Sequence, residues 1–154
     1  ALAAKLGQEV SVRLLLERRV DVEAATPNGW TPLLFASRAG HSAVASQLLQ
    51  YRAAPGAATS NGRTPLILAC QVNHQPLLDL LLDAGADPSA TMQAAWDALH
   101  YAAQGCHAAL CRTLASHGAP VNAKAAGGWT ALHLAAQAGS ASTLQVLAER
   151  KAKL

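Results

Sequence analysis

The chain repeats itself with a period of 33 residues, and this period limits its fold more than any other feature. The segment NGWTPLLFASRAGHSAV begins at Asn28 and returns as NGRTPLILACQVNHQPL from Asn61. Related segments begin at Ala94 (AAWDALHYAAQGCHAAL) and at Gly127 (GGWTALHLAAQAGSAST). Because the step holds without an insertion, each copy is predicted to be one structural unit that stacks on the copy before it.

Several columns of residues keep this step in phase with one another. Hydrophobic residues make up 51% of the chain, so chance could align one column of leucines but not several columns together. The columns are Thr31, Thr64, Asp97 and Thr130; Leu33, Leu66, Leu99 and Leu132; Ala36, Ala69, Ala102 and Ala135; and Leu15, Leu48, Leu81, Leu114 and Leu147.

Each copy predicts a helix, a turn, a second helix and an extended loop. Thr31 is a good N-cap, and Pro32 follows it at a helical position where a missing N–H costs little. Gly40 ends the first helix because glycine adopts the left-handed conformation freely, and Ser42 begins the second helix. The pair Asn61-Gly62 is typical of the tip of a hairpin.

The segments Asn61–Ala90 (NGRTPLILAC…LLDLLLDAGADPSA) and Gly128–Gly139 (GWTALHLAAQAG) resemble the ankyrin repeat, which has this period and a T-P-L-H-x-A pattern. The resemblance covers essentially the whole chain. It implies an all-α solenoid of stacked helix-turn-helix units with projecting hairpin-like loops.

The resemblance also sets the expected domain organisation, which is one domain over residues 1–154. It has a partial first repeat at 1–25, full repeats at 26–58, 59–91 and 92–124, and a truncated last repeat at 125–154. Lys151–Leu154 fall where other copies begin a loop. Since the chain starts and ends inside a repeat, we expect it to be a fragment, or the ordered part, of a longer protein.

The fourth repeat departs most from the pattern. Ala94-Ala95 replaces the Asn-Gly pair, and Cys106 stands where other copies have Gly or Asn. Only His100 and His133 keep the histidine that the family places after the leucine. We therefore expect local strain or a special role in this repeat.

Composition excludes several classes of function. The net charge of +3, from 12 basic and 9 acidic residues, is too small and too evenly spread for a nucleic-acid footprint. Three cysteines without a paired pattern favour free thiols in an intracellular compartment, the cytoplasm or the nucleus. No apolar run approaches the roughly 20 residues that cross a bilayer, so we expect no membrane insertion.

The histidines do not predict a metal site. His41, His74 and His107 occur once per repeat, and stacked helices lie about 8–10 Å apart. Zinc needs ligands about 2 Å from one ion, so this column is expected to tie repeats together by hydrogen bonds.

The cysteines do not predict chemistry either. The densest cluster, Cys106-His107 with Cys111 and His100, spans a turn and does not share a helical face. Cys70 is in a predicted core position, and no activated nucleophile or phosphate-binding loop is found. We expect no enzyme activity, no metal, no cofactor and no small-molecule substrate.

All three tryptophans occupy one column at the loop tips: Trp30, Trp96 and Trp129, with Arg63 in the remaining copy. Trp and Arg are the residues most enriched in binding hot spots, which favours a stripe that docks a partner. The alternative is that each Trp only packs over the adjacent tip. The sequence leaves both interpretations open.

In ankyrin-like proteins, partners usually meet the concave face, formed by the loop tips and the solvent side of the first helices. The resemblance places the following residues there: at the tips Asn28, Trp30, Asn61, Arg63, Trp96, Lys124 and Trp129, and on the helices Lys5, Arg38, Gln71, Gln104 and Gln137. This ribbon is polar, amide-rich and mildly basic. It would suit an extended peptide or loop with some acidic character.

We therefore expect a protein–protein interaction module that works by equilibrium binding. One alternative is a methyl-lysine or other modified-peptide reader, in which Trp96 and Trp129 hold an ammonium by cation–π attraction and Asp97 supplies the acid. Another is a substrate-recruiting or regulatory arm of a larger multidomain enzyme.

Overall fold

The structure, a computed structural model, describes residues 1–152 and divides the chain into two compact units, Ala1–Ala86 and Asp87–Leu154. Residues 1–152 form helices and loops without any strand, which confirms the predicted all-α fold. The predicted single domain over 1–154 stays a prediction. The end of its last repeat, residues 153–154, lies outside the described part of the chain.

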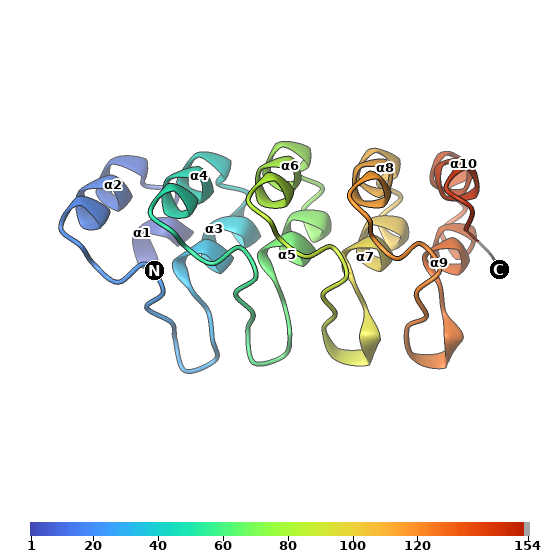
Figure 1. The fold of residues 1–154 in the computed structure, drawn as a ribbon, viewed down its shortest axis with the longest axis horizontal. Helices are drawn as coiled ribbons and strands as arrows, with labels where there is room; N and C mark the ends of the chain where they lie inside the picture. The colour runs from blue at the N-terminus through green and yellow to red at the C-terminus, as the bar shows by residue number, and fades with distance from the viewer. Residues whose placement is uncertain (153–154) are drawn as a thin grey trace. The chain divides into compact units, whose positions relative to one another are not determined.

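The first unit contains three helix pairs, namely α1 (Leu2–Lys5) with α2 (Glu9–Glu17), α3 (Pro32–Ala39) with α4 (Ser42–Gln50), and α5 (Pro65–Gln71) with α6 (Gln75–Asp83). The first helices form one layer, in which α3 packs against both α1 and α5. The second helices form another layer in the order α2, α4, α6 (Figure 1). The loops between pairs project from the side of the first helices.

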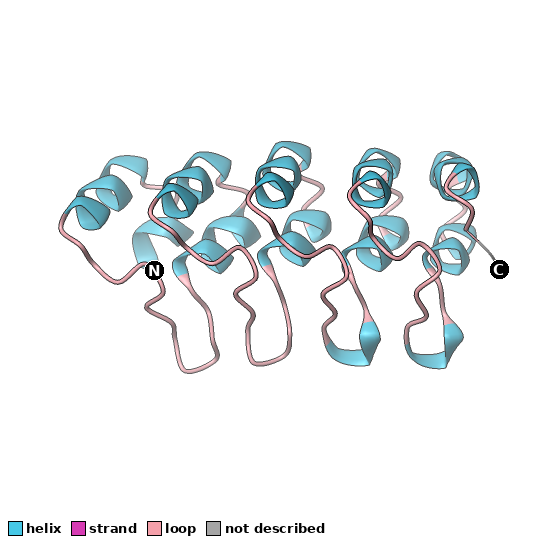
Figure 2. Ribbon diagram, in the orientation of Figure 1, coloured by secondary structure: helices cyan, strands magenta, loops and turns pink. Residues whose placement is uncertain are grey.

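The second unit contains two helix pairs, α7 (Ala98–Gln104) with α8 (Ala108–Ser116) and α9 (Ala131–Gln137) with α10 (Ala141–Glu149). Here α7 packs against α9 and α8 against α10. Short 3₁₀ turns form the two loop tips, η1 (Gln93–Ala95) and η2 (Ala126–Gly128), whereas the tips of the first unit are plain loops (Figure 2).

The predicted cap column begins the first helices α3, α5, α7 and α9. The side-chain oxygens of Thr31, Thr64 and Thr130 accept from the backbone N–H three residues later, at 3.4, 3.3 and 3.4 Å. Asp97, the member of this column that is not threonine, does the same for the N–H of His100 at 3.0 Å. Each such bond satisfies a donor at the helix start and contributes about 1 kcal/mol.

The predicted turn column ends the first helices in the left-handed conformation. Gly40 has a φ of 73°, and its counterparts Asn73 and Cys106 have φ values of 53° and 61°. Asparagine tolerates this region best after glycine. Cysteine has no such preference, so the backbone at Cys106 is strained, as the departure from the pattern indicated.

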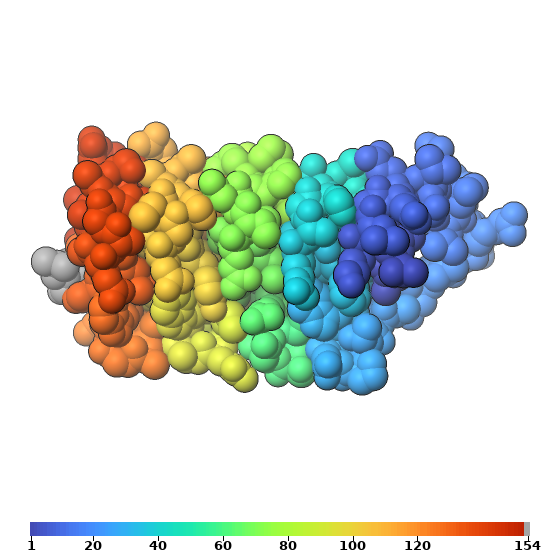
Figure 3. Space-filling model, turned by 180° about the vertical axis from the view of Figure 1, so that it is seen from behind, coloured from blue at the N-terminus to red at the C-terminus, as the bar shows by residue number. Residues whose placement is uncertain are grey.

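The core consists of small and leucine side chains. Ala36, Ala69, Ala102 and Ala135 are each 0% exposed, and Leu48, Leu81, Leu114 and Leu147 are buried with them. In the first unit, the side chains of successive repeats form adjoining bands (Figure 3). Leu15 keeps the step of the leucine column but is 45% exposed, because within residues 1–152 the packing partners of α2 are α1 and α4.

Ala69 offers a test of the packing at the alanine column. Because Ala69 is completely buried in α5, replacing it with Leu should overpack the layer and lower the free energy of unfolding by about 1–3 kcal/mol. Denaturant unfolding measures the change. The matched control is Ala43→Leu, since Ala43 is exposed on α4. Equal stabilities of Ala69→Leu and the unchanged protein would contradict close packing.

Candidate functional site

The loop tips are short hairpin-like turns closed by backbone hydrogen bonds. At the first tip the N–H of Gly29 donates to the carbonyl of Thr26 at 2.8 Å, and the N–H of Thr26 donates to the carbonyl of Trp30 at 3.1 Å. The same pair of bonds recurs at the tips that end in Arg63, Trp96 and Trp129. The tips thus hold the four side chains of the predicted stripe at equivalent positions of their repeats.

The two neighbouring tips of the first unit are also tied to each other. The N–H of Ser60 donates to the carbonyl of Asn28 at 3.1 Å. A Cβ on Gly29, whose φ is 78°, would lie 3.2 Å from the backbone of Ala58, Thr59 and Ser60. Glycine at this position is therefore required both by the backbone conformation and by the close approach of the next tip.

The tip of the fourth copy reaches its turn without glycine. Ala94 and Ala95 have φ values of 62° and 57°, whereas the corresponding residues of the last copy, Gly127 and Gly128, have 76° and 79°. An alanine in the left-handed region costs roughly 1–2 kcal/mol. The loss of the Asn-Gly pair therefore stores strain in this tip, as the sequence indicated.

Each tryptophan packs against the first helix of its own repeat. The ring of Trp30 lies 5.1 Å from that of Phe35, and the guanidinium carbon of Arg38 lies 5.3 Å from the centre of the Trp30 ring. The latter distance is within the range of a cation–π contact. Trp30 is half-buried and Arg38 is exposed, so an aromatic and a cationic group share one surface of the first unit.

In the second unit the ring of Trp96 lies 5.0 Å from that of Tyr101, and the ring of Trp129 lies 5.9 Å from that of His133. Trp96 is half-buried, and Trp129 is 38% exposed. The tryptophans therefore brace the tips and also present surface, which is compatible with both interpretations. That all four positions form one stripe stays a prediction, because Trp30 and Arg63 lie in a different unit.

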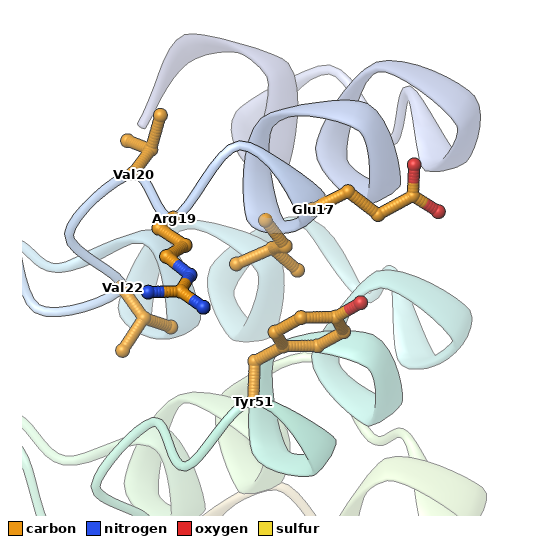
Figure 4. Close-up of a pocket in the computed structure, with 6 residues that line it drawn as sticks. Glu17, Arg19, Val20, Val22 and Tyr51 are labelled. Atoms are coloured by element: carbon orange, nitrogen blue, oxygen red, sulfur yellow. The ribbon is translucent and has the colours of Figure 1, made fainter.

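Two hollows differ in their relation to the predicted face. One, of about 420 Å³, adjoins a tip and is lined by Met92, Gln93, Ala94, Trp96, Tyr101 and Gln104. A larger one, of about 540 Å³, lies by the ends of α2 and α4, away from the tips, and is lined by Leu16, Glu17, Arg19, Val20, Val22 and Tyr51. In the larger hollow the Glu17 carboxylate extends away from Arg19, so the two charges do not converge on one point (Figure 4).

The remaining predicted contact residues differ in their exposure. Asn28, Gln71, Gln104, Lys124 and Gln137 are exposed, and Asn61 and Arg63 are half-buried. Arg38, Gln71, Gln104 and Gln137 lie in the last turns of α3, α5, α7 and α9. Their role as partner contacts stays a prediction.

The histidine column does tie one repeat to another at one position. The Nε2 of His41 lies 3.2 Å from the carbonyl oxygen of Lys5 in the preceding repeat. His74 instead caps its own helix, because its Nδ1 accepts from the N–H of Leu77 at 3.2 Å. Within residues 1–152 no group of three or more His, Cys, Asp or Glu side chains is placed to hold a metal ion.

Within residues 1–152 no cysteine forms a disulfide, and the three thiols have different surroundings. Cys70 is completely buried, which confirms its predicted core position. Cys111 is buried too, and desolvation raises the pKa of its thiol to about 12, so it is a poor nucleophile at neutral pH. Cys106 is exposed.

The only acidic residue among the tips and first helices is buried. Asp97 is 0% exposed, and its Oδ1 lies 2.7 Å from the Nδ1 of His100. The carboxylate that the modified-peptide alternative assigned to an ammonium is thus turned into the protein and occupied by the imidazole.

Sequence reasoning missed the residues on which the tryptophans rest. Phe35 and Tyr101 occupy the same position in their repeats, each five residues after a tryptophan. This recurrence in the sequence could have indicated that the two rings of each pair pack together. Met92 is also part of this cluster, since the Tyr101 hydroxyl donates to its Sδ at 2.9 Å. Only the structure brings Met92 to Tyr101.

Comparisons with known proteins agree with the repeat pattern. The family model described as ankyrin repeats (3 copies) matches residues 1–92 and again residues 91–154. No curated protein matches the chain. Within residues 1–152, no helix has the length and apolar character needed to cross a membrane.

The strained tip allows a test by glycine substitution. Because Ala95 has a positive φ, Ala95→Gly should raise the free energy of unfolding by about 1 kcal/mol. The control is Ala126→Gly, because Ala126 is an exposed tip residue without a positive φ, and its replacement should be slightly destabilising. Denaturant unfolding compares the two. If Ala95→Gly also destabilises, the tip is not strained in this way.

Proposed function

The chain belongs to the ankyrin repeat family, and we propose that it binds a partner protein or peptide through its loop tips and the exposed sides of its first helices. Ankyrin repeats are generally protein–protein interaction modules. The ankyrin family match extends over the whole chain, and such repeats are typical of binding domains without catalysis.

The distribution of charge is the observation that carries this proposal. Eight of the nine acidic residues lie in second helices or in the stretch of loop between a second helix and the next tip: Glu9, Glu17, Asp21, Glu23, Asp79, Asp83, Asp87 and Glu149. The ninth, Asp97, is buried. The tips and first helices therefore expose no carboxylate, whereas Lys5 and Arg38 are exposed and Arg63 is half-exposed there.

This asymmetry favours a partner with acidic side chains. Charges of one sign on a binding face steer an oppositely charged partner and discriminate against like-charged ones. The exposed amides of Gln71, Gln104 and Gln137 add groups that both donate and accept hydrogen bonds. An extended acidic peptide or loop could use both features.

The aromatic residues supply the apolar part of the proposed face. Trp30 with Phe35 and Trp96 with Tyr101 are half-buried, so their rings are held in place and still offer surface. Rigid aromatic side chains of this kind dominate binding energy at interfaces, because little side-chain entropy remains to be lost.

No observation favours the modified-peptide alternative. A methylated ammonium in a protein cage needs aromatic faces and gains from a nearby acid. Asp97 is the acid that this alternative required, and its carboxylate is buried against His100. The aromatic cluster at Trp96 is better suited to an uncharged side chain.

The test uses peptides selected from a random display library against the whole chain. We expect the selected peptides to be rich in Asp and Glu. Arg38→Ala should then weaken binding about tenfold and reduce its dependence on salt, because it removes a charge from the proposed face. The matched control is Arg13→Ala, since Arg13 is exposed on α2 in the same unit and lies outside the face.

Trp129→Ala separates docking from bracing in the same assay. As a docking residue, Trp129 should contribute about 2 kcal/mol or more to affinity and less to the free energy of unfolding. Unbiased peptide selection, or equal affinities for Arg38→Ala and Arg13→Ala, would contradict the proposed face. A large loss of stability with unchanged affinity of the folded Trp129→Ala protein would assign that side chain to bracing alone.

A further inference from the structure

The fourth repeat contains a buried acid–base pair at the point where it meets the tip of the next repeat. Asp97 and His100 are 0% and 1% exposed, and 2.7 Å separates the Asp97 Oδ1 from the His100 Nδ1. On the other side of the ring, Nε2 lies 3.3 Å from the carbonyl oxygen of Trp129. The imidazole thus joins the cap of α7 to the tip that precedes α9.

Both ring nitrogens of His100 face an oxygen that can only accept. A neutral imidazole carries one N–H, so it can donate either to the carboxylate or to the Trp129 carbonyl. The other nitrogen would then direct a lone pair at an oxygen lone pair. While the Asp97 carboxylate is ionised, only the imidazolium donates at both ends, and therefore only the protonated ring satisfies both contacts.

The carboxylate has no better partner available. The other oxygen of Asp97, Oδ2, is buried and makes no hydrogen bond within residues 1–152. A buried carboxylate without a compensating charge is costly, so a cation on His100 lowers that cost. The backbone N–H of Asp97 also points at this Nδ1, but at 3.5 Å, the limit of a hydrogen bond, it is much farther from the ring nitrogen than Oδ1 at 2.7 Å.

We propose that Asp97 and His100 form a proton-binding site that fastens the tip carrying Trp129 to α7 when the imidazole is protonated. When the proton leaves, one of the two contacts of the ring becomes repulsive, and the tip is held less firmly. The site makes this attachment depend on pH.

The last repeat shows what the same position does without an acid. There Thr130 occupies the cap, and its hydroxyl lies 2.8 Å from the Nδ1 of His133. A hydroxyl can donate to an unprotonated nitrogen as well as accept. The Thr130–His133 pair therefore holds together without a cation, and the exchange of Thr for Asp at position 97 creates the need for one.

The surroundings of the ring agree with this assignment. Burial lowers the pKa of His100, but the hydrogen bond and charge of Asp97 and the carbonyls of Trp129 and Ala123 outweigh burial, so the pKa is raised. Within the second unit Asp97 is the charged group facing the ring, and the tilted ring of Trp96 has its centre 5.9 Å from that of His100. The other titratable or charged groups of the adjoining elements α8, α9 and the tip are His107, Cys111, Arg112, Lys124 and His133.

The sign of the effect follows from the direction of the pKa shift. A raised pKa in the folded state means that folding favours the protonated ring. This stabilisation is complete below the ordinary histidine pKa of about 6.5 and is lost as the pH rises through the higher pKa of the folded protein. Mild acidification should therefore tighten the tip. This inference does not depend on the proposed binding function.

The first experiment follows the ring nitrogens of His100 by ¹⁵N NMR in the unchanged chain, with His100→Gln for assignment. We expect protonation of His100 with a midpoint above about 6.5. A midpoint at or below that value would overturn the proposal. The titration itself is recorded on the unchanged chain.

The second experiment compares the unchanged chain with Asp97→Thr, which copies the Thr130–His133 arrangement. Between about pH 6 and about pH 8.5, the Tm of the unchanged chain should fall by several degrees more than that of the variant. The midpoint of His100 should also fall in the variant. Parallel curves of Tm against pH, with equal midpoints for His100, would show that Asp97 does not bind the proton with His100 and would overturn the inference.

Discussion

The structure depends on the close approach of successive first helices, which small side chains at their contacts permit. In the first unit α3 packs against α1 on one side and α5 on the other, with Ala36 and Ala69 fully buried. This spacing fixes the position of everything attached to the helices. The N-caps hold the loops at the helix starts, and the tips of neighbouring repeats can then bond to each other, as Ser60 does to Asn28. A binding surface made of tips is therefore only as precise as the packing behind it.

Most of the fold could be predicted from the sequence because each local signal has a local cause. Thr31 caps a helix through its own side chain, and Gly40 ends one through its own backbone conformation. Asp97 also accepts a hydrogen bond at the helix start, and Asn73 also adopts a positive φ, so each performs the role of its column. The exposure of Leu15 could not be predicted from its place in the leucine column. That place indicates the side of the helix on which the leucine lies, but not whether another element covers that side.

The candidate site was less predictable, because its important contacts join residues whose relation depends on side-chain conformation. The column of Trp30, Trp96 and Trp129 was visible, but its packing on Phe35, Tyr101 and His133 was not. Asp97 belongs to the cap column, and the modified-peptide alternative also assigned it as the acid for a ligand. Its Oδ1 accepts the capping hydrogen bond and also contacts the imidazole of His100, so the carboxylate faces inward. A substitution that keeps the capping role can thus change the electrostatics of the interior.

The nearest-neighbour arrangement of the first unit has a consequence for how it transmits mechanical change. Since α3 lies between α1 and α5, a displacement of the outer helix α1 reaches α5 through α3, as it would in a row of coupled springs. The middle repeat of this unit shares an interface with each of its neighbours, so a displacement of one neighbour can reach the other only through it. A local displacement therefore passes from one helix to the next, and the stiffness of each helix–helix interface determines how much of it is transmitted.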